Sequence, residues 1–184
     1  MRVADSNKRF HRITAIEIIY ATMTDTDSAL YRLKETYNDL KNLGIEAFEL
    51  SEERPQVGDN IEIISGYWER GYSCQIDDFV FRLKEASWTF VDSIRYSKPG
   101  CKTIGGTSGS PIIDSDSRLV VGVNNTANES GKRCSMNNPC EVDENNSVTV
   151  RRGATYGQQT YLIYSCLNSQ NEFDLQQPGC ELPK

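Results

Sequence analysis

Short runs of β-branched and aromatic residues recur along this chain, and turn-forming residues separate them. Four of these runs lie at residues 12–21, 28–33, 60–67 and 88–96. Further runs lie at residues 75–83, 111–113, 119–124, 148–151 and 160–164. Runs of this length and spacing are typical of β-strands in a sandwich or barrel. The pattern therefore predicts an all-β fold.

One segment has helical periodicity instead. Within residues 36–44, the apolar side chains of Tyr37, Leu40 and Leu43 recur at the spacing of one helix face. Thr36 is a suitable N-cap, and Gly44 is a suitable residue to end the helix. We expect a short helix here, inserted in a loop of the β fold.

The charge and hydropathy of the chain exclude two classes of partner. Acidic residues outnumber basic ones by 26 to 20, and the net charge is −6. No run of Lys and Arg exceeds two residues, so we expect no nucleic-acid partner. The longest apolar run, residues 15–21, is interrupted by Glu17 and is far shorter than the roughly 20 residues that span a bilayer. We therefore expect no membrane partner.

The cysteines indicate an oxidising compartment. The chain has six of them and a single histidine, His11, and no two cysteines form a C-x-x-C pair, which disfavours a metal site. An even number of cysteines in loop-like sequence favours disulfides, hence a secreted or extracytoplasmic protein. Residues 1–8 lack the apolar core of a signal peptide, so we expect that signal to be absent from this chain. A cytosolic protein with free thiols is the alternative.

The segment with the clearest chemistry is residues 103–113, Thr-Ile-Gly-Gly-Thr-Ser-Gly-Ser-Pro-Ile-Ile. A serine becomes a nucleophile when a base takes its proton and backbone N–H groups stabilise the oxyanion. Gly106 and Gly109 on either side of Ser108 permit the necessary turns. The elbow G-x-S-x-G of α/β-hydrolases does not fit, because Ser110 replaces its second glycine and no histidine follows Ser108. A glycine-serine turn without chemistry is the alternative.

The sequence Gly-Thr-Ser-Gly-Ser-Pro at residues 106–111 resembles the G-x-S-G-[GS]-P signature of trypsin-like serine peptidases, in its bacterial and glutamyl-endopeptidase form. The resemblance implies a chymotrypsin-like double β-barrel without metal or cofactor. It also implies that Ser108 attacks the scissile carbonyl, while the N–H groups of Gly106 and Ser108 form the oxyanion hole. Thr107 stands where trypsin has an aspartate that pairs with a newly cut N-terminus, so that route of activation is not expected.

Other segments resemble the same family. Residues 24–33 are similar to its aspartate segment, D-[IVS]-A-L-x-x-L, which implies that Asp27 is the triad aspartate. The competing interpretations are Asp25 in that role, or a turn aspartate that caps a backbone amide. Residues 57–67 resemble the first strand of the second barrel, and residues 153–157 resemble the strand that closes the specificity pocket.

The resemblance also implies a substrate-binding set. Residues 121–125 look like the strand after the nucleophile, and the carbonyl of Asn125 would bind an extended peptide by strand addition. Lys102 and Thr103 would line the base or wall of the primary pocket, with Asn124 nearby. A lysine there would disfavour basic side chains and favour acidic ones by charge pairing, unless Lys102 points to solvent.

The chain departs from the family in one respect. It lacks the A-A-H-C-like segment that carries the catalytic histidine, and His11 lies too close to Asp27 to replace it, so we expect an ordinary exposed histidine. We therefore expect residues 1–54 to be the last strands of a first barrel with the helical insertion. Residues 55–184 would form a second barrel with the nucleophile and a disulfide-tied tail.

Three explanations remain open: a truncated fragment, a chain that pairs with a separate N-terminal part, and an inactive homologue. The predicted function is that of a serine endopeptidase acting on protein or peptide substrates, incomplete as given. The alternative is an inactive peptidase-like module that binds extended peptides. The order of the cysteines suggests the pairs Cys74–Cys101, Cys134–Cys140 and Cys166–Cys180 among fifteen possible pairings. Three N-x-[ST] triplets begin at Asn124, Asn128 and Asn145.

Overall fold

The computed structural model describes all residues except 1, 6, 8 and 97–99. Its elements are β1 (Arg2–Ala4), β2 (Phe10–Arg12), β3 (Ala15–Thr22), β4 (Ser28–Leu33), α1 (Tyr37–Asn42), β5 (Asn60–Ser65), β6 (Arg70–Glu85), β7 (Trp88–Tyr96), β8 (Pro111–Asp114), β9 (Val120–Ala127), β10 (Cys140–Val142), β11 (Val148–Thr149), β12 (Thr155–Gln159) and the 3-10 helix η1 (Tyr161–Cys166). The all-β prediction is confirmed.

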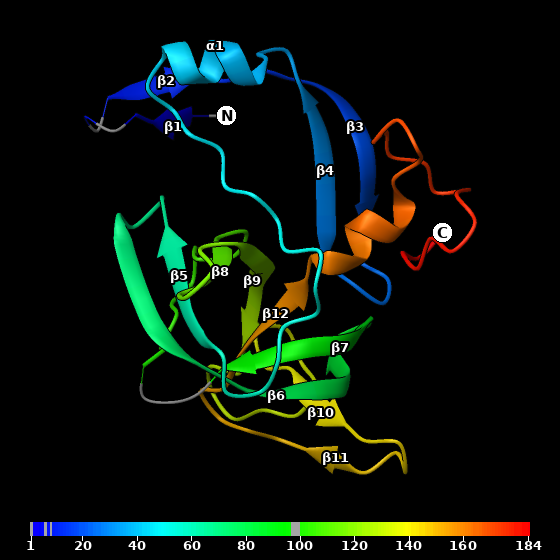
Figure 1. The fold of residues 1–184 in the computed structure, drawn as a ribbon. Helices are drawn as coiled ribbons and strands as arrows, with labels where there is room; N and C mark the ends of the chain where they lie inside the picture. Colours follow the sequence, from blue (N-terminus) through cyan, green and yellow to red (C-terminus); the bar gives the residue numbers. More distant parts are fainter. Residues whose placement is uncertain (1, 6, 8, 97–99) are drawn as a thin grey trace.

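The largest unit is an antiparallel sheet that closes on itself. The strands pair in the order β6–β5–β8–β9–β12–β7, and β7 pairs again with β6, while β10 and β11 extend from β6 (Figure 1). Because β7 pairs with both β12 and β6, each of these six strands has a neighbouring strand on both sides over at least part of its length. We call them the closed sheet.

Alternation along the strands builds the core of the closed sheet. In β5, Ile61 and Ile63 are fully buried, whereas the intervening residues face outward, as a half-buried strand requires. Tyr96 and Ile112 pack in the same cluster. Gly157 of β12 lies against the hydroxyl of Tyr96 and the backbone of β9, where a Cβ atom would clash. Glycine at this position therefore allows the strands to close around the aromatic core.

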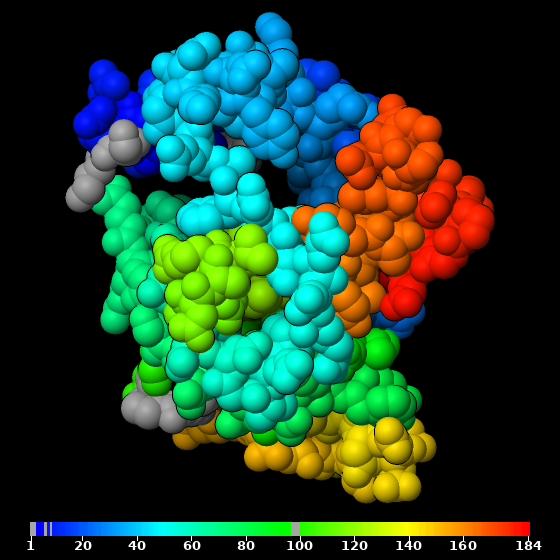
Figure 2. Space-filling model, viewed as in Figure 1, coloured from blue at the N-terminus to red at the C-terminus, as the bar shows by residue number. Residues whose placement is uncertain are grey.

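Residues before β5 form smaller units. β1 pairs with β2, β3 pairs with β4, and a long segment leads from α1 to the closed sheet (Figure 1). Thr36 caps α1 as predicted: its hydroxyl accepts from the backbone of Asp39, whose carboxylate accepts from the backbone of Thr36. A groove of about 1450 Å³ lies between α1, this long segment and the closed sheet, and Figure 2 shows the surface hollowed below α1.

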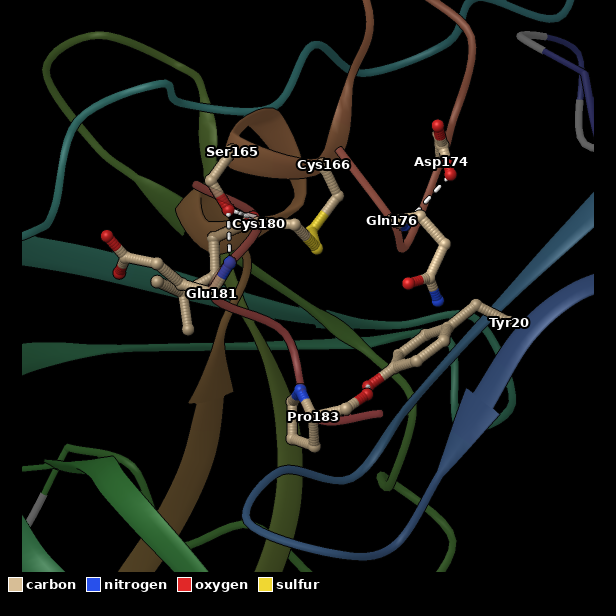
Figure 3. Close-up of a disulfide and its surroundings, with 9 residues drawn as sticks. Tyr20, Ser165, Cys166, Asp174, Gln176, Cys180, Glu181 and Pro183 are labelled. Atoms are coloured by element: carbon tan, nitrogen blue, oxygen red, sulfur yellow. Dashed lines mark hydrogen bonds between the residues drawn. A yellow bond between two sulfur atoms is a disulfide. The ribbon is translucent and has the colours of Figure 1, made fainter. Parts of the chain in front are cut away.

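The segment after β12 packs against the hairpin β3–β4. Tyr20 of β3 lies in a cluster with Cys166 and Leu182, and its hydroxyl donates to the carbonyl of Pro183 over 3.1 Å (Figure 3). In the same region the hydroxyl of Ser165 accepts from the backbone of Glu181. The tail thus supplies apolar neighbours that a two-stranded hairpin cannot provide for itself.

The three expected disulfides are confirmed: Cys74–Cys101, Cys134–Cys140 and Cys166–Cys180. The first joins β6 to the loop after β7, the second lies beside β10, and the third ties the tail to η1. No helix in the described part of the chain is long and apolar enough to cross a membrane.

Some expected elements differ from the structure. Residues 160–164 form most of the helix η1 rather than a strand. The polar segment at residues 126–147 includes the end of β9 and the strand β10, which pairs with β6. The hairpin β1–β2 was not expected, and β6 extends on both sides of the predicted strand at 75–83.

Candidate functional site

Ser108 lies in the loop between β7 and β8, with its side chain exposed. Its hydroxyl donates to the backbone carbonyl of Asn125 in β9, over 2.6 Å. On the same strand, Asn124 accepts from the amide of Gly109 and donates to the carbonyl of Ser110, each over 2.8 Å. These bonds fix the loop against β9 and leave the Ser108 hydroxyl at the surface.

The residues before Ser108 form a tight turn. The amide of Thr107 donates to the carbonyl of Ile104 over 3.1 Å, and Gly106 has a φ of +91°. In a four-residue turn, a positive φ at the third residue but not at the second is characteristic of type II. Glycine is favoured at that third position, which Gly106 occupies here. The predicted role of Gly106, to permit a backbone turn beside the nucleophile, agrees with this geometry.

Thr107 holds the end of this turn. Its side chain is 2% exposed, and its hydroxyl donates to the carbonyl of Ile104 over 2.7 Å. The same hydroxyl accepts from the side-chain amide of Asn124 over 3.2 Å. A neutral threonine thus makes two side-chain hydrogen bonds at this buried position, while Oδ1 of Asn124 is buried without a partner among the described residues.

A small depression of about 60 Å³ adjoins Ser108. It brings together Thr103, Ser108, Asn124 and Asn125, four of the residues that the sequence analysis placed in the site. Lys102 does not line it and is exposed to solvent, in agreement with the solvent-facing alternative. A space of this size admits a few water molecules rather than a large side chain.

Asp27 lies in the loop between β3 and β4, which β7 holds in place. The backbone of Asp25 accepts from Val91 over 2.7 Å and donates to Thr89 over 3.1 Å. Burial of the Asp27 side chain, and then the negative charge of Glu85, raise the pKa of Asp27 above its ordinary value. In the described part of the chain, no hydrogen bond or ion pair connects the Asp27 carboxylate with Ser108. The triad role of Asp27 stays a prediction.

Sequence reasoning missed two residues near the site. Glu85 is 5% exposed at the end of β6, and its carboxylate accepts from the amide of Asn137, which lines the depression beside Ser108. Alternation from the buried Leu83 could have placed Glu85 on the inner face. Trp68, in the turn between β5 and β6, donates its indole N–H to the carbonyl of Gly105 over 3.0 Å. No pattern in the sequence indicates that contact.

His11 lies in β2, which Figure 1 shows at the top of the molecule beside α1, whereas β8 lies near the middle. Its Nε2 atom is 3.0 Å from the carboxylate of Asp5. This hydrogen bond, together with the backbone N–H of Arg9, holds the pKa of Asp5 well below its ordinary value. His11 is therefore engaged locally and does not approach Ser108. Among the described residues, no group of His, Cys, Asp and Glu side chains could hold a metal ion.

The fold can be compared with solved structures. The protease domain of MamO from Magnetospirillum magneticum, in its apo form, matches with a TM-score of 0.59 and 12% sequence identity, over 91% of this chain and 74% of that one. Rv3671c from M. tuberculosis, a serine-to-alanine mutant in an inactive form, matches with a TM-score of 0.49 and 12% identity, over 83% of this chain and 61% of that one. No protein-family model matches the sequence, and no curated protein matches it significantly.

The match with the MamO domain shows the fold alone, because the sequence identity is low. On that basis the chain has an all-β, chymotrypsin-like fold, and this prediction is confirmed.

Proposed function

We propose that this chain is the nucleophile-bearing part of a trypsin-like serine endopeptidase. The observation that carries the proposal is the placement of Ser108: an exposed hydroxyl that follows a glycine-containing type II turn, in a chymotrypsin-like fold. In this proposal Ser108 attacks the scissile carbonyl, and the N–H groups of Gly106 and Ser108 stabilise the resulting oxyanion.

The pairing of β9 supports a binding mode for the substrate backbone. β8 pairs with β9 only as far as the pair Pro111–Val123. Residues Asn125–Ala127 of β9 lie beyond the paired region, on the edge that faces Ser108. An extended peptide can add to this edge as a further strand. Its N–H group would then take the carbonyl of Asn125 and release the hydroxyl of Ser108 for attack. Substrate binding and release of the nucleophile would be one event.

The proposed base lies outside these 184 residues, because His11 is bound to Asp5 in a distant hairpin. The environment of Asp27 supports this assignment. Its carboxylate is half-buried, is close to the negative charge of Glu85, and has no cationic partner among the described residues. An imidazolium supplied by a further segment, or by a second chain, would compensate this charge. Asp27 would then orient the imidazole as in a triad.

Labelling with a fluorophosphonate tests the nucleophile. The reagent forms a Ser–O–P bond and releases fluoride, and the exposed site allows added imidazole to act as an external base. We expect an adduct on Ser108, mapped by mass spectrometry, whose yield rises with imidazole concentration. Loss of the histidine alone costs on the order of a million-fold in rate in related chemistry, so long incubation is required.

Ser108→Ala should abolish the adduct, and Ser110→Ala is the matched control. Ser110 lies two residues away and is buried, and no hydrogen bond of its hydroxyl occurs in the described structure. Ser110→Ala should therefore label at the rate of the unaltered chain. An adduct that persists in Ser108→Ala, or a complete absence of labelling with imidazole, would contradict the proposed nucleophile.

A peptide-binding module without catalysis is the second candidate. The bond from the Ser108 hydroxyl to a backbone carbonyl favours it, since an amide oxygen is not a base that could take the proton. Calorimetric titration with extended peptides separates the two functions. Binding that is equal in the unaltered chain and in Ser108→Ala, without products after long incubation with imidazole, would favour the module.

A further inference from the structure

Two aromatic side chains lie beside the turn that precedes the nucleophile. Tyr67 is 77% exposed and Trp68 is 46% exposed, and both belong to the turn between β5 and β6. Their rings meet edge to face with centroids 4.9 Å apart. The backbone amide of Trp68 donates to the hydroxyl of Ser65 over 3.3 Å, which fixes the base of this turn. The indole N–H of Trp68 reaches the carbonyl of Gly105 over 3.0 Å.

Two hydrogen bonds fix the ends of the 104–107 turn, and they do not involve its central peptide. Both the amide and the hydroxyl of Thr107 donate to the carbonyl of Ile104, over 3.1 and 2.7 Å. The central peptide between Gly105 and Gly106 takes no part in those bonds. Rotation of this peptide plane would convert type II geometry to type I while both ends stay in place. The turn is therefore an element with two available states.

The direction of the central peptide decides what the turn presents to a ligand. In a trans peptide, the carbonyl of Gly105 and the N–H of Gly106 point in opposite directions. In the observed state the carbonyl points to Trp68, and the N–H points away from it. In the rotated state the carbonyl would take the place of the N–H. The site would then present an acceptor where an oxyanion requires a donor.

We propose that Trp68 is a positioning residue that selects the donor state of the 104–107 turn. Its indole N–H is the hydrogen-bond partner of the Gly105 carbonyl in the described structure, and a rotated peptide would lose this bond. Trp68 also lies close to the turn, because a Cβ atom on Gly106 would be 3.1 Å from Nε1 of Trp68. The significance of the donor state for catalysis rests on the proposed peptidase function, whereas the effect of Trp68 on the turn does not.

Nuclear Overhauser contacts in the full chain report the turn directly. A type II turn brings the α-protons of Gly105 close to the amide proton of Gly106, whereas a type I turn brings the two amide protons together. We expect the first contact in the unaltered chain. Trp68→Phe removes the N–H donor and keeps an aromatic ring, and it should shift the equilibrium toward type I by roughly two- to tenfold, the value of one neutral hydrogen bond.

Tyr67→Phe is the matched control, since it changes the neighbouring aromatic residue and leaves the bond to Gly105 intact. It should retain the contact pattern of the unaltered chain. If Trp68→Phe also retains that pattern, or if both variants change it equally, the proposal is wrong. Thermal unfolding of both variants establishes that each is folded, and a change in melting temperature without a change in the contacts would count against the proposal.

Fluorophosphonate labelling with imidazole then connects the turn with reactivity. We expect Trp68→Phe to label Ser108 more slowly, by the same factor at every imidazole concentration, since the oxyanion donor and not the base has changed. If the contacts change but neither protein labels, the proposed peptidase function fails while the role of Trp68 in the turn stands. Equal labelling rates with changed contacts would overturn the connection between this turn and the oxyanion.

Discussion

At the scale of single residues, Gly106 combines an unusual backbone conformation with close neighbours. Its φ of +91° is one that residues with a Cβ atom rarely adopt, and the space beside it is occupied by Trp68 and Tyr67. We expect Gly106→Ala to lower the free energy of unfolding by about 1–3 kcal/mol, measured by urea denaturation. It should also slow labelling of Ser108, because relief of the strain requires the peptide plane to rotate.

Gly105→Ala is the control for that substitution. A Cβ atom at Gly105 meets no atom within 4 Å, and its φ lies outside the left-handed region. We expect this variant to unfold within about 0.5 kcal/mol of the unaltered chain. Equal destabilisation by the two substitutions would contradict the turn geometry described above.

Asp27 should make stability depend on pH. Since its pKa is raised in the folded protein, the folded state binds this proton more tightly than the unfolded chain does. The pKa of Asp27 is near 4 in the unfolded chain and higher in the folded protein. The free energy of unfolding therefore falls as the pH rises from the first value through the second. Above the folded pKa, the full destabilisation by the Asp27 charge is present. Asp27→Asn should remove it and stabilise the protein at pH 7 by on the order of 0.5 kcal/mol, a value reduced by solvent screening.

At pH 3 the same substitution should have almost no effect, which thermal unfolding at the two pH values will show. Asp25→Asn is the matched control, because this exposed residue lies in the same loop and asparagine tolerates its φ of 61°. A gain at pH 7 in Asp25→Asn as large as that in Asp27→Asn would contradict the assignment of the penalty to Asp27.

The residues of the site differ in how far sequence could predict them. The nucleophile motif is local, so Ser108, Gly106 and the turn between them followed from adjacent residues. Glu85 and Trp68 reach the site through hairpins whose tips depend on the register of β5 and β6, which local patterns leave undefined. Burial also distinguishes the three N-x-[ST] triplets from one another. The asparagines at 124 and 128 are buried, while Asn145 lies in an exposed turn.

At the scale of elements, a partly buried ionic cluster joins three strands, with Arg95 and Glu141 largely buried and the two aspartates half exposed. Arg95 of β7 pairs with Asp77 and Asp78 of β6 over 3.0 and 3.1 Å, and with Glu141 of β10 over 2.9 Å. The hydroxyl of Tyr156 also donates to Glu141. Burial alone would lower the pKa of Arg95, but the bonds with Glu141 and Asp77 raise it overall.

Arg95→Met should be costly, because it removes the largely buried cation beside Glu141 and leaves that carboxylate paired with the half-exposed Arg151. We expect a loss of about 3–5 kcal/mol in urea denaturation, and a partial recovery in the double variant Arg95→Met with Glu141→Gln. The control is Arg32→Met in the exposed pair of Arg32 with Glu17, which should cost less than about 1 kcal/mol. Similar losses in the two single variants would show that burial does not govern the cluster.

Two elements show where the periodicity of apolar residues is insufficient to predict secondary structure. The run at residues 160–164 predicts a strand, but so short a run fits a helix equally well. Bonds from Ile163 to Thr160 and from Leu167 to Tyr164 close 3-10 turns there. β10 begins at the disulfide-bonded Cys140 in polar sequence, so its pairing with β6 depends on tertiary context rather than on composition.

At the scale of the whole molecule, the hairpin β3–β4 depends on a distant part of the chain. Its core is completed by η1 and the tail, which the disulfide Cys166–Cys180 closes into a loop with a sequence separation of 14. Removing this disulfide by Cys166→Ala with Cys180→Ala should cost about 3 kcal/mol. Hydrogen exchange should show lost protection in β3 and β4, while β5 and β8 of the closed sheet retain theirs.

The matched control is the pair Cys134→Ala with Cys140→Ala, which opens a shorter loop beside β10. It should leave the exchange of β3 and β4 unchanged. Equal loss of protection in β3 from both double variants would contradict the dependence described here. The predicted division at residue 54 places β3 and β4 in the first unit and Cys166 and Cys180 in the second, so loss of protection in β3 and β4 on removal of this disulfide would count against two independent units.

The contact between Tyr20 and Pro183 has a consequence for biosynthesis. The two residues are 163 positions apart, so at roughly 5–20 residues per second the hairpin waits on the order of 10–30 s for its partner. The strands of the closed sheet, in contrast, are all present once residue 159 has been made. Until the tail has been made, the hairpin therefore lacks the residues that cover Tyr20 and Leu30 in the folded protein.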